Sequence, residues 1–125
     1  MEPYKAKDNW HKRAYISGKM KGLERIQIKG GFHRAHNELV TKYGFHPDNI
    51  ISPADLDAKF PSFREEEFLK LDLFLIKEMG VQVVYMMHNW EDSNGAKKEK
   101  ALAEELGLEI WYQPKKEETE LKWKK

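Results

Sequence analysis

Residues 81–112, VQVVYMMHNWEDSNGAKKEKALAEELGLEIWY, contain one unit of strand, loop, helix and strand. Val81–Met87 is an apolar, β-branched and aromatic run of the kind found in buried strands. A segment rich in turn formers follows, and the apolar residues of Ala96–Leu106 then recur at helical spacing as far as Gly107, a typical helix-ending residue. Leu108–Tyr112 predicts the last strand. A strand, helix and strand in this order imply a parallel pair joined by a crossover helix.

The rest of the chain continues this alternation of strands and helices. The further elements that we expect are strands at Arg13–Ser17 and Asn49–Ser52, helices at Phe32–Tyr43 (ended by Gly44) and Phe63–Met79 (ended by Gly80), and a loop at residues 54–62. Such alternation predicts an α/β domain with three layers, Rossmann-like (flavodoxin-like), around a mostly parallel sheet of four or five strands.

Length and composition narrow the class of protein. The chain has 125 residues, no cysteine, and 22 Lys and Arg against 21 Asp and Glu, a net charge of +1. We therefore expect one domain at residues 13–113, a polar arm at 1–12 and a charged tail at 114–125. The charge balance argues against a surface for polymeric nucleic acid. No apolar run could span a bilayer and the N-terminus lacks a secretory signal, so the expected location is cytoplasmic, with no membrane partner.

Two carboxylates interrupt apolar helix faces. At about 100° per residue, Glu99 falls between Leu102 and Ala103 on the apolar stripe of its helix, and Asp72 falls in the middle of the stripe of helix 63–79. Burying an ionised carboxylate is costly unless it finds a partner. One buried carboxylate could be explained by a hydrogen bond within the core. Two buried carboxylates beside the edge of the sheet where ligands are expected favour a functional pair. Paired carboxylates are typical of glycosidic chemistry.

Several small or polar residues are expected at that same edge, where ligands bind beyond the carboxyl ends of parallel strands. We expect the following to bind a substrate: Ser17, Gly18, His88 and Trp90. Trp90 could stack on a base, or could equally be a hydrophobic plug beneath its loop. Ser93-Asn94-Gly95-Ala96, at a helix N-terminus, could hold a phosphate, although ordinary N-capping explains it as well.

Other clusters suggest no metal or cofactor. His33 and His36 could lie on adjacent turns of a helix, but no third ligand is evident, so we expect surface histidines. Gly18-Lys19-Met20-Lys21-Gly22 lacks the spacing of a Walker phosphate loop.

Four segments carry a resemblance to a known family: YISGKMKG, ISPADLD, LKLDL and WEDSNGAKKEKALAEELGLEI. They resemble the nucleoside 2-deoxyribosyltransferase superfamily over roughly residues 13–112, and most closely its short bacterial and phage members, which are similar to 2′-deoxynucleoside 5′-monophosphate N-hydrolases. The most specific part is Ser93-x-Gly95-x-x-x-Glu99 together with Tyr15 and Asp72. The chain departs from the superfamily at His88-Asn89, where Pro-Gly often precedes the loop Trp, and at Met79-Gly80, where an Asp is usual.

The resemblance implies roles for these residues. Glu99 would attack the anomeric carbon and expel the base, Asp72 would bind the sugar hydroxyl or handle protons, and Tyr15 would position Glu99. Ser93 and Gly95 would bind a 5′-phosphate with a basic residue, for which Lys21 stands at the expected place.

The implied activity is cleavage of the N-glycosidic bond of a deoxynucleoside 5′-monophosphate, by hydrolysis or deoxyribosyl transfer, through a covalent glutamyl-deoxyribosyl intermediate. The implied partner is a small-molecule nucleotide, and the implied assembly is a homodimer or larger. We expect Trp111 and Tyr112 to be exposed, and this region or the face of helix 63–79 could supply the contact. The alternative is a non-catalytic module that binds or sequesters a nucleotide or nucleotide-derived signal. A protein-interaction domain would leave the buried carboxylates unexplained.

Overall fold

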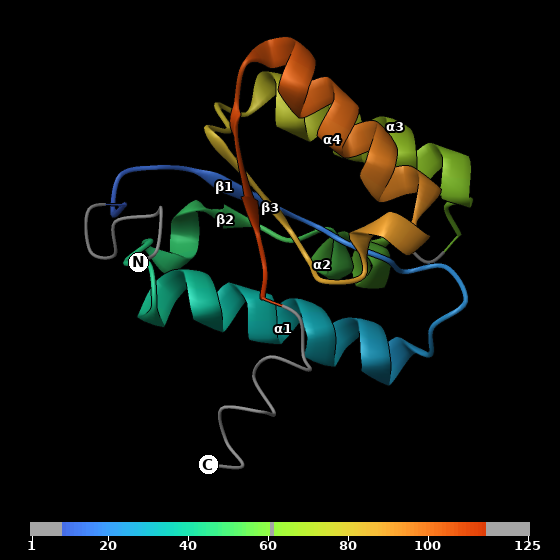
Figure 1. Cartoon of the computed structure of the whole chain (residues 1–125). Coiled ribbons are helices and arrows are strands. Elements are labelled where there is room, and N and C mark those ends of the chain that lie inside the picture. Colours follow the sequence, from blue (N-terminus) through green and yellow to red (C-terminus); the bar gives the residue numbers. More distant parts are fainter. Residues whose placement is uncertain (1–8, 61, 115–125) are drawn as a thin grey trace.

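A sheet of four parallel strands lies at the centre of the computed structural model, which describes residues 9–60 and 62–114 (Figure 1). The strands, in the spatial order β2-β1-β3-β4, are β1 (Ala14–Ser17), β2 (Ile50–Ile51), β3 (Val83–Met86) and β4 (Glu109–Tyr112). One face of the sheet is covered by α1 (Arg25–Thr41), and the other by α3 (Glu65–Glu78) and α4 (Asn94–Leu106). These three layers confirm the predicted α/β Rossmann-like fold, with four strands that are all parallel.

The strand order creates a switch point between β1 and β3. The chain passes from β1 to β2 on one side and then crosses to β3 on the other, where Ser17 pairs with Met86 and Met86 with Tyr112. The carboxyl ends of these three strands therefore meet at one edge of the sheet. In open parallel sheets, ligands bind at that edge beside the switch point.

The alternation of side chains along β1 separates two cores. Ala14 and Ile16 belong to the cluster beneath α1, which includes Phe32 and Leu39. Tyr15 points to the opposite face and packs with buried side chains of α3 and α4. The period of two along a strand sends alternate residues to opposite faces, so one short strand serves both cores.

Helix α1 begins earlier than the Phe32 start that we predicted. Its first turn is closed by a capping box in which the Glu24 N–H donates to Gln27 Oε1 at 2.9 Å. Gly30 and Gly31, which lie just before the start that we predicted, are inside the helix. A Cβ on Gly31 would lie 3.2 Å from Cε of Met87, so glycine lets the helix pack closely on the end of β3.

The loop that we predicted at residues 54–62 is also wrong, because α2 (Pro53–Lys59) occupies most of it. Pro53 starts the helix, where its missing N–H costs nothing, and Asp55 and Lys59 suit the charges of its two ends. A helix of seven residues is too short to show a periodic apolar stripe. Short 3₁₀ turns complete the elements: η1 (Pro47–Asn49), which shortens the predicted second strand, and η2 (Trp90–Asp92).

The observed ends of the last two helices agree more closely with the predicted ones. α3 and α4 occupy the two helical segments that we predicted, within two residues at each end. Gly107 ends α4 with φ 74°, a left-handed conformation that glycine adopts without steric cost.

The predicted polar arm is partly packed on the domain. Asn9 is buried, and its side-chain amide donates to the Tyr43 carbonyl at 2.7 Å, while Lys12 lies 3.3 Å from Glu109. The rest of the arm and the charged tail, residues 1–8 and 115–125, lie outside the described residues. Trp111, which we expected to be exposed, is only 3% exposed and contacts Phe45 edge to face.

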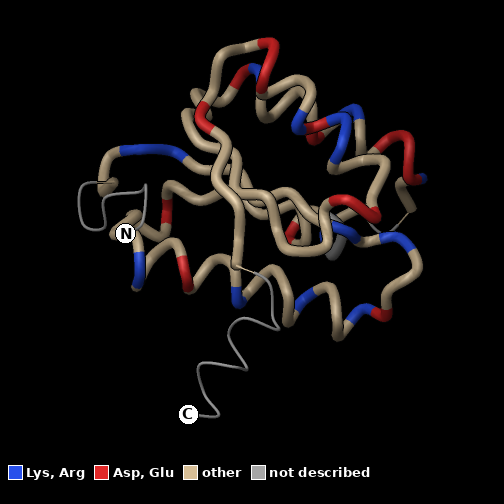
Figure 2. Tube along the Cα trace, viewed as in Figure 1, with Lys and Arg blue, Asp and Glu red and all other residues tan. Residues whose placement is uncertain are grey.

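Charges of both signs are interspersed along the outer helices, and the central strands β1 and β3 carry none (Figure 2). Within the described part of the chain, no helix has both the length and the apolar character that crossing a bilayer requires.

Candidate active site

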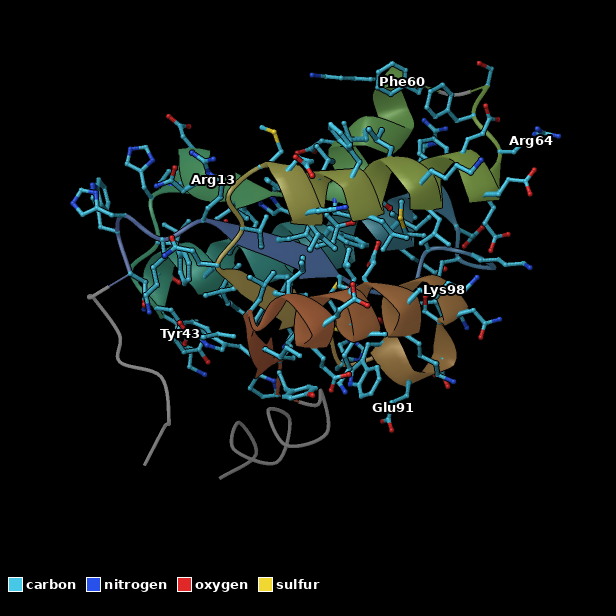
Figure 3. The ribbon with its side chains drawn as sticks, turned by 90° about the horizontal axis from the view of Figure 1, so that it is seen from above. Arg13, Tyr43, Phe60, Arg64, Glu91 and Lys98 are labelled. Carbon is cyan, nitrogen blue, oxygen red and sulfur yellow. The ribbon has the colours of Figure 1, made fainter. Side chains whose placement is uncertain are left out.

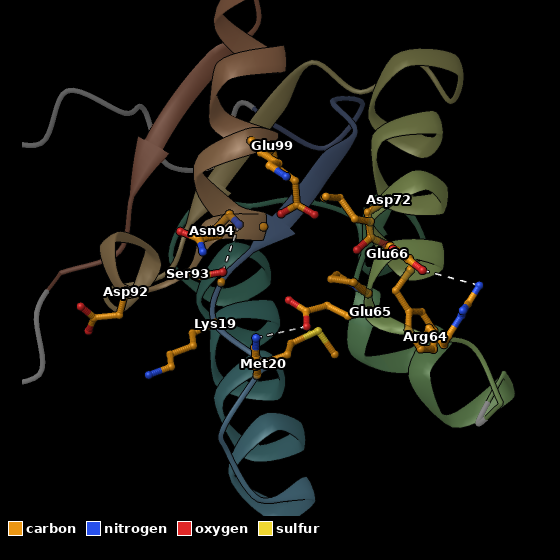
Figure 4. A pocket seen from close by; sticks show the side chains of 18 of the residues that line it. Lys19, Met20, Arg64, Glu65, Glu66, Asp72, Asp92, Ser93, Asn94 and Glu99 are labelled. Carbon is orange, nitrogen blue, oxygen red and sulfur yellow. Dashed lines mark hydrogen bonds and ion pairs between the residues drawn. The ribbon is translucent and has the colours of Figure 1, made fainter.

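A pocket of about 850 Å³ opens at the carboxyl edge of the sheet. Its walls are the loop after β1, the first half of α3, and the first turns of α4 with the loop before them (Figure 4). Seen from above the sheet, α3 and α4 lie side by side and begin at the same end of the molecule (Figure 3). The pocket therefore lies between two helix N-termini, at the switch point where the fold predicts a ligand.

Glu99 lies deep in this pocket and is only 4% exposed. The Tyr15 hydroxyl donates to Oε2 of Glu99 at 2.9 Å, and the Ser17 hydroxyl donates to Oε1 at 2.5 Å. Both donors lie on the face of β1 that points to α4, because they are two residues apart in a strand. The strand thus fixes both carboxylate oxygens of Glu99.

Asp72 faces Glu99 from α3, and the two side chains point toward one another (Figure 4). It is 7% exposed, and its Oδ1 has no hydrogen-bond partner within the described residues. Leaving a buried polar atom unpaired costs about 1–3 kcal/mol, so such atoms call for an explanation. A donor group of a bound ligand would satisfy this oxygen.

Burial raises the pKa of both carboxyl groups. The pKa of Asp72 rises to about 6 through desolvation, and the pKa of Glu99 rises to about 8 through desolvation and the nearby charge of Asp72. The hydroxyls of Ser17 and Tyr15 lower the pKa of Glu99 and oppose part of that rise. Burial and the two carboxylates also raise the pKa of Tyr15 well above its usual value, so its hydroxyl stays a donor at neutral pH.

The expected phosphate-binding residues lie on the α4 side of the pocket and on the β1 loop. Ser93 Oγ accepts a hydrogen bond from the Ala96 N–H at 3.0 Å, so Ser93 is the N-cap of α4. Gly95 and Lys21 also line the pocket. The Lys21 ammonium lies 3.5 Å from Oε2 of Glu65, and both side chains are largely exposed.

Residues 12–112 match the model of a protein family described as a domain of unknown function, DUF4406. The chain belongs to this family. Comparisons with curated proteins and with solved structures gave no significant match. The DUF4406 domain spans every strand and helix described above and both buried carboxylates.

Four residues that we expected at the site do not line this pocket of the DUF4406 domain. Tyr15 and Ser17, the latter expected to bind substrate, are fully buried and donate to Glu99 instead, and Trp90 and His88 lie outside the pocket. The Trp90 ring packs against the core beneath α3 and α4, with its centroid 6.0 Å from that of Tyr112 and 5.4 Å from the Lys100 ammonium. This placement corresponds to the plug and not to a base-stacking position. His88 is exposed, and its backbone N–H donates to Gln113 Oε1 at 3.0 Å.

Gly18 does line the pocket, and its packing explains the glycine. A Cβ at this position would lie 2.4 Å from the Met87 sulfur, so only glycine lets the ends of β1 and β3 approach this closely. His33 contacts Asn37 at 3.2 Å, and the residues that the structure describes include no group of three or more His, Cys, Asp or Glu that could hold a metal ion.

Sequence reasoning missed the aromatic wall of the pocket. Phe63, Phe68 and Leu69 all line it. Phe68 and Leu69 fall on the same helical stripe as Asp72, a pattern that we attributed to the core. The position of Asp72 on that stripe was the available signal, because a carboxylate facing a pocket implies that its neighbours on the stripe face the pocket too.

Proposed function

We propose that this DUF4406 domain cleaves the N-glycosidic bond of a deoxynucleoside 5′-monophosphate by nucleophilic catalysis with retention at the anomeric carbon. The observation that carries the proposal is the pair of buried carboxylates: Glu99, whose two oxygens accept hydroxyl hydrogen bonds, and Asp72, which faces it with an unpaired oxygen. Most enzymes that cleave glycosidic bonds use two carboxyl groups in one pocket, one as the nucleophile and one as the acid and base.

The first step forms a bond between a Glu99 oxygen and C1′ of the sugar. The C1′–N bond breaks, its electron pair goes to the base, and Asp72 donates a proton to that base. With pKa values of about 6 and about 8, the pair keeps one proton between these limits. The higher pKa of Glu99 places that proton mainly on Glu99, so the reactive arrangement, with the proton on Asp72, is the minor form of the pair. The two hydroxyl donors directed at Glu99 favour its ionised form and so increase the share of this arrangement.

The second step returns the carboxylates to their starting state. Water attacks C1′ of the glycosyl ester, Asp72 takes a proton from the water, and Glu99 leaves as a carboxylate. The net reaction consumes one water and yields free base and deoxyribose 5-phosphate. The absence of a 2′-hydroxyl favours the oxocarbenium-like transition state, so a deoxyribose suits this mechanism better than a ribose.

The 5′-phosphate would bind at the N-terminus of α4. Helix N-termini present unpaired N–H groups, and Gly95 lies in the first turn of this helix at the pocket wall. Lys21, in the loop after β1, also lines the pocket and would supply a positive charge. Ser93 would support the site by capping the helix and holding its first turn in place.

A second candidate function is binding of a nucleotide or nucleotide-derived signal without cleavage. The observation that favours it is the raised pKa of Glu99, because a protonated carboxyl group is a poor nucleophile. The two functions share the pocket and differ only in whether base is released.

The deciding experiment incubates the pure protein with a panel of deoxynucleosides and their 5′-monophosphates and detects free base by chromatography. We expect base release from one or more monophosphates, and a loss of several orders of magnitude in rate for Glu99→Ala. Tight binding with no base release would favour the second function. Base release that survives in Glu99→Ala would mean that another group is the nucleophile.

We also expect this domain to form at least a homodimer. Tyr112 is 43% exposed, and on the outer side of α3 Phe74 is 56% and Met79 is 42% exposed. Either region would offer an apolar contact to a second copy. Light scattering that gives a monomer mass at working concentration would contradict this assembly.

A further inference from the structure

The pocket has an aromatic wall that the core of the domain does not use. Phe63, Phe68 and Leu69 line the pocket, are half-buried, and belong to neither of the two clusters of buried side chains. Phe63 lies between two other rings, stacked on Phe60 with centroids 4.8 Å apart and tilted against Phe68 at 5.3 Å. Half-buried aromatic rings that line a concave pocket are typical of ligand contacts.

This wall lies beside the proposed reacting atoms. Phe68 precedes Asp72 by four residues of α3, so the two share one face of the helix about 6 Å apart along its axis. Asp72 in turn faces Glu99 across the pocket (Figure 4). A group released beside Asp72 would therefore lie next to the Phe68 ring.

The two sides of the pocket differ in chemistry. Both helices begin at the pocket, but the α3 side carries the aromatic rings and three acidic residues in its first turn, Glu65–Glu67. The first turn of α4 carries no acidic residue, and this side of the pocket has Ser93, Gly95 and the exposed Lys98. A nucleotide has the same asymmetry, because its base is planar and aromatic and its phosphate is anionic. The acidic first turn of α3 disfavours a phosphate on that side, so the walls favour the direction of binding that places the phosphate at α4.

We propose that Phe68, supported by Phe63, is the stacking surface for the base of the substrate, with the phosphate directed toward α4. This inference rests on the proposed function, since it places the leaving base within reach of Asp72. Phe68 would thus replace Trp90, whose ring packs against the core outside the pocket. Stacking of a base on an aromatic side chain changes affinity by about tenfold to hundredfold.

The test measures binding without turnover, by calorimetry on the full chain carrying Glu99→Gln. The probes are the four common deoxynucleoside 5′-monophosphates and deoxyribose 5-phosphate, which has no base. We expect Phe68→Leu to weaken the best-bound monophosphate about tenfold or more and to leave deoxyribose 5-phosphate within about twofold. Phe68→Trp, which keeps an aromatic face, should restore most of the affinity.

The matched control is Phe74→Leu, the same substitution on the exposed side of the same helix, with light scattering on all variants. It should change neither affinity. Equal weakening of both probes in Phe68→Leu, no weakening of either, or the same loss in Phe74→Leu would overturn the inference, as would failure of every monophosphate to bind. Because base release is not measured, a wild-type protein that binds but never cleaves would refute only the proposed function.

Discussion

The two faces of β1 bury their side chains equally but hold different chemistry. Ala14 and Ile16 on one face, and Tyr15 and Ser17 on the other, are all 0% exposed. The face toward α1 meets an apolar cluster with aromatic and aliphatic side chains. The face toward α3 and α4 holds a carboxylate by two hydroxyl groups, with a second carboxylate opposite. Burial alone therefore does not distinguish the part of the fold that stabilises it from the part that forms the site.

This difference has an energetic consequence. Apolar burial beneath α1 stabilises the fold at every pH, at about 25 cal/mol for each Å² removed from water. The carboxylates beneath α3 and α4 lose hydration, and their raised pKa values mean that the folded state resists their ionisation. Substitutions on the two faces should therefore change the free energy of unfolding in opposite directions and by different amounts.

The largest expected effect is on catalysis, at Asp72. Asp72→Asn keeps the shape of the side chain but cannot give or take the proton, so base release should fall by about 10²- to 10⁴-fold. Nucleotide binding, followed by calorimetry, should remain. Retention of more than about a tenth of the wild-type rate would exclude Asp72 as the acid and base.

The next prediction contrasts stability on the two faces. Leu39→Ala, in the cluster beneath α1, should lower the free energy of unfolding by about 2–5 kcal/mol at any pH, because it leaves a cavity. Glu99→Gln should instead raise it. Thermal unfolding of the three proteins between pH 5 and 9 makes the comparison.

The sign for Glu99 follows from its pKa, which is raised from 4.5 to about 8 in the folded protein. The unfolded chain releases its proton first, so this group lowers stability progressively as pH rises from about 4.5 to about 8. Glutamine cannot ionise, so its advantage should be small at pH 5 and should grow to a Tm several degrees above wild type near pH 8 to 9. A constant difference across that range would show that ionisation of Glu99 plays no part.

A smaller effect is expected at Ser17, the second hydroxyl donor. Removing it should raise the pKa of Glu99 further, because the hydroxyl stabilises the ionised form. We expect Ser17→Ala to reduce base release about tenfold and to move the basic limb of the pH–rate profile, which reflects the higher pKa of the pair, to higher pH. Ser17→Thr, which keeps the hydroxyl, should recover part of the rate. An unshifted profile would indicate a packing role only.

The smallest predicted effect lies at the rim of the pocket. Glu65 neutralises Lys21, so Glu65→Gln should leave Lys21 free for the phosphate and tighten monophosphate binding about two- to fivefold at low salt. Lys21→Ala should weaken it. Affinity for bare deoxynucleosides should change in neither variant, and calorimetry with both ligand classes would detect a departure from this pattern.

Much of the architecture could be predicted from the sequence, because α3, α4 and the strands around them carry clear periodicity. The start of α1 could not, since the close approach to Met87 that makes Gly31 useful exists only in the folded chain. α2 was missed because one or two helical turns show no stripe. In each case a tertiary contact or a short length removed the local signal.

The residues of the site also divide into those that the sequence could predict and those that it could not. Glu99 and Asp72 were predictable because a carboxylate on an apolar stripe contradicts the pattern around it. Phe68 obeys that pattern, and periodicity does not distinguish a side chain that faces the core from one that faces a pocket. Trp90 was ambiguous for the converse reason, since its packing against Tyr112 depends on a strand far along the chain.

The central claim, that Glu99 is a nucleophile, is tested most directly by trapping its adduct. A reaction of wild-type protein with the monophosphate that releases base is quenched in acid during turnover, and the intact protein is analysed by mass spectrometry. We predict a fraction of chains heavier by one deoxyribosyl phosphate, attached to the peptide that contains Glu99, and no such species in Glu99→Ala. Base release with no adduct in wild type, and at an undiminished rate in Glu99→Ala, would contradict it.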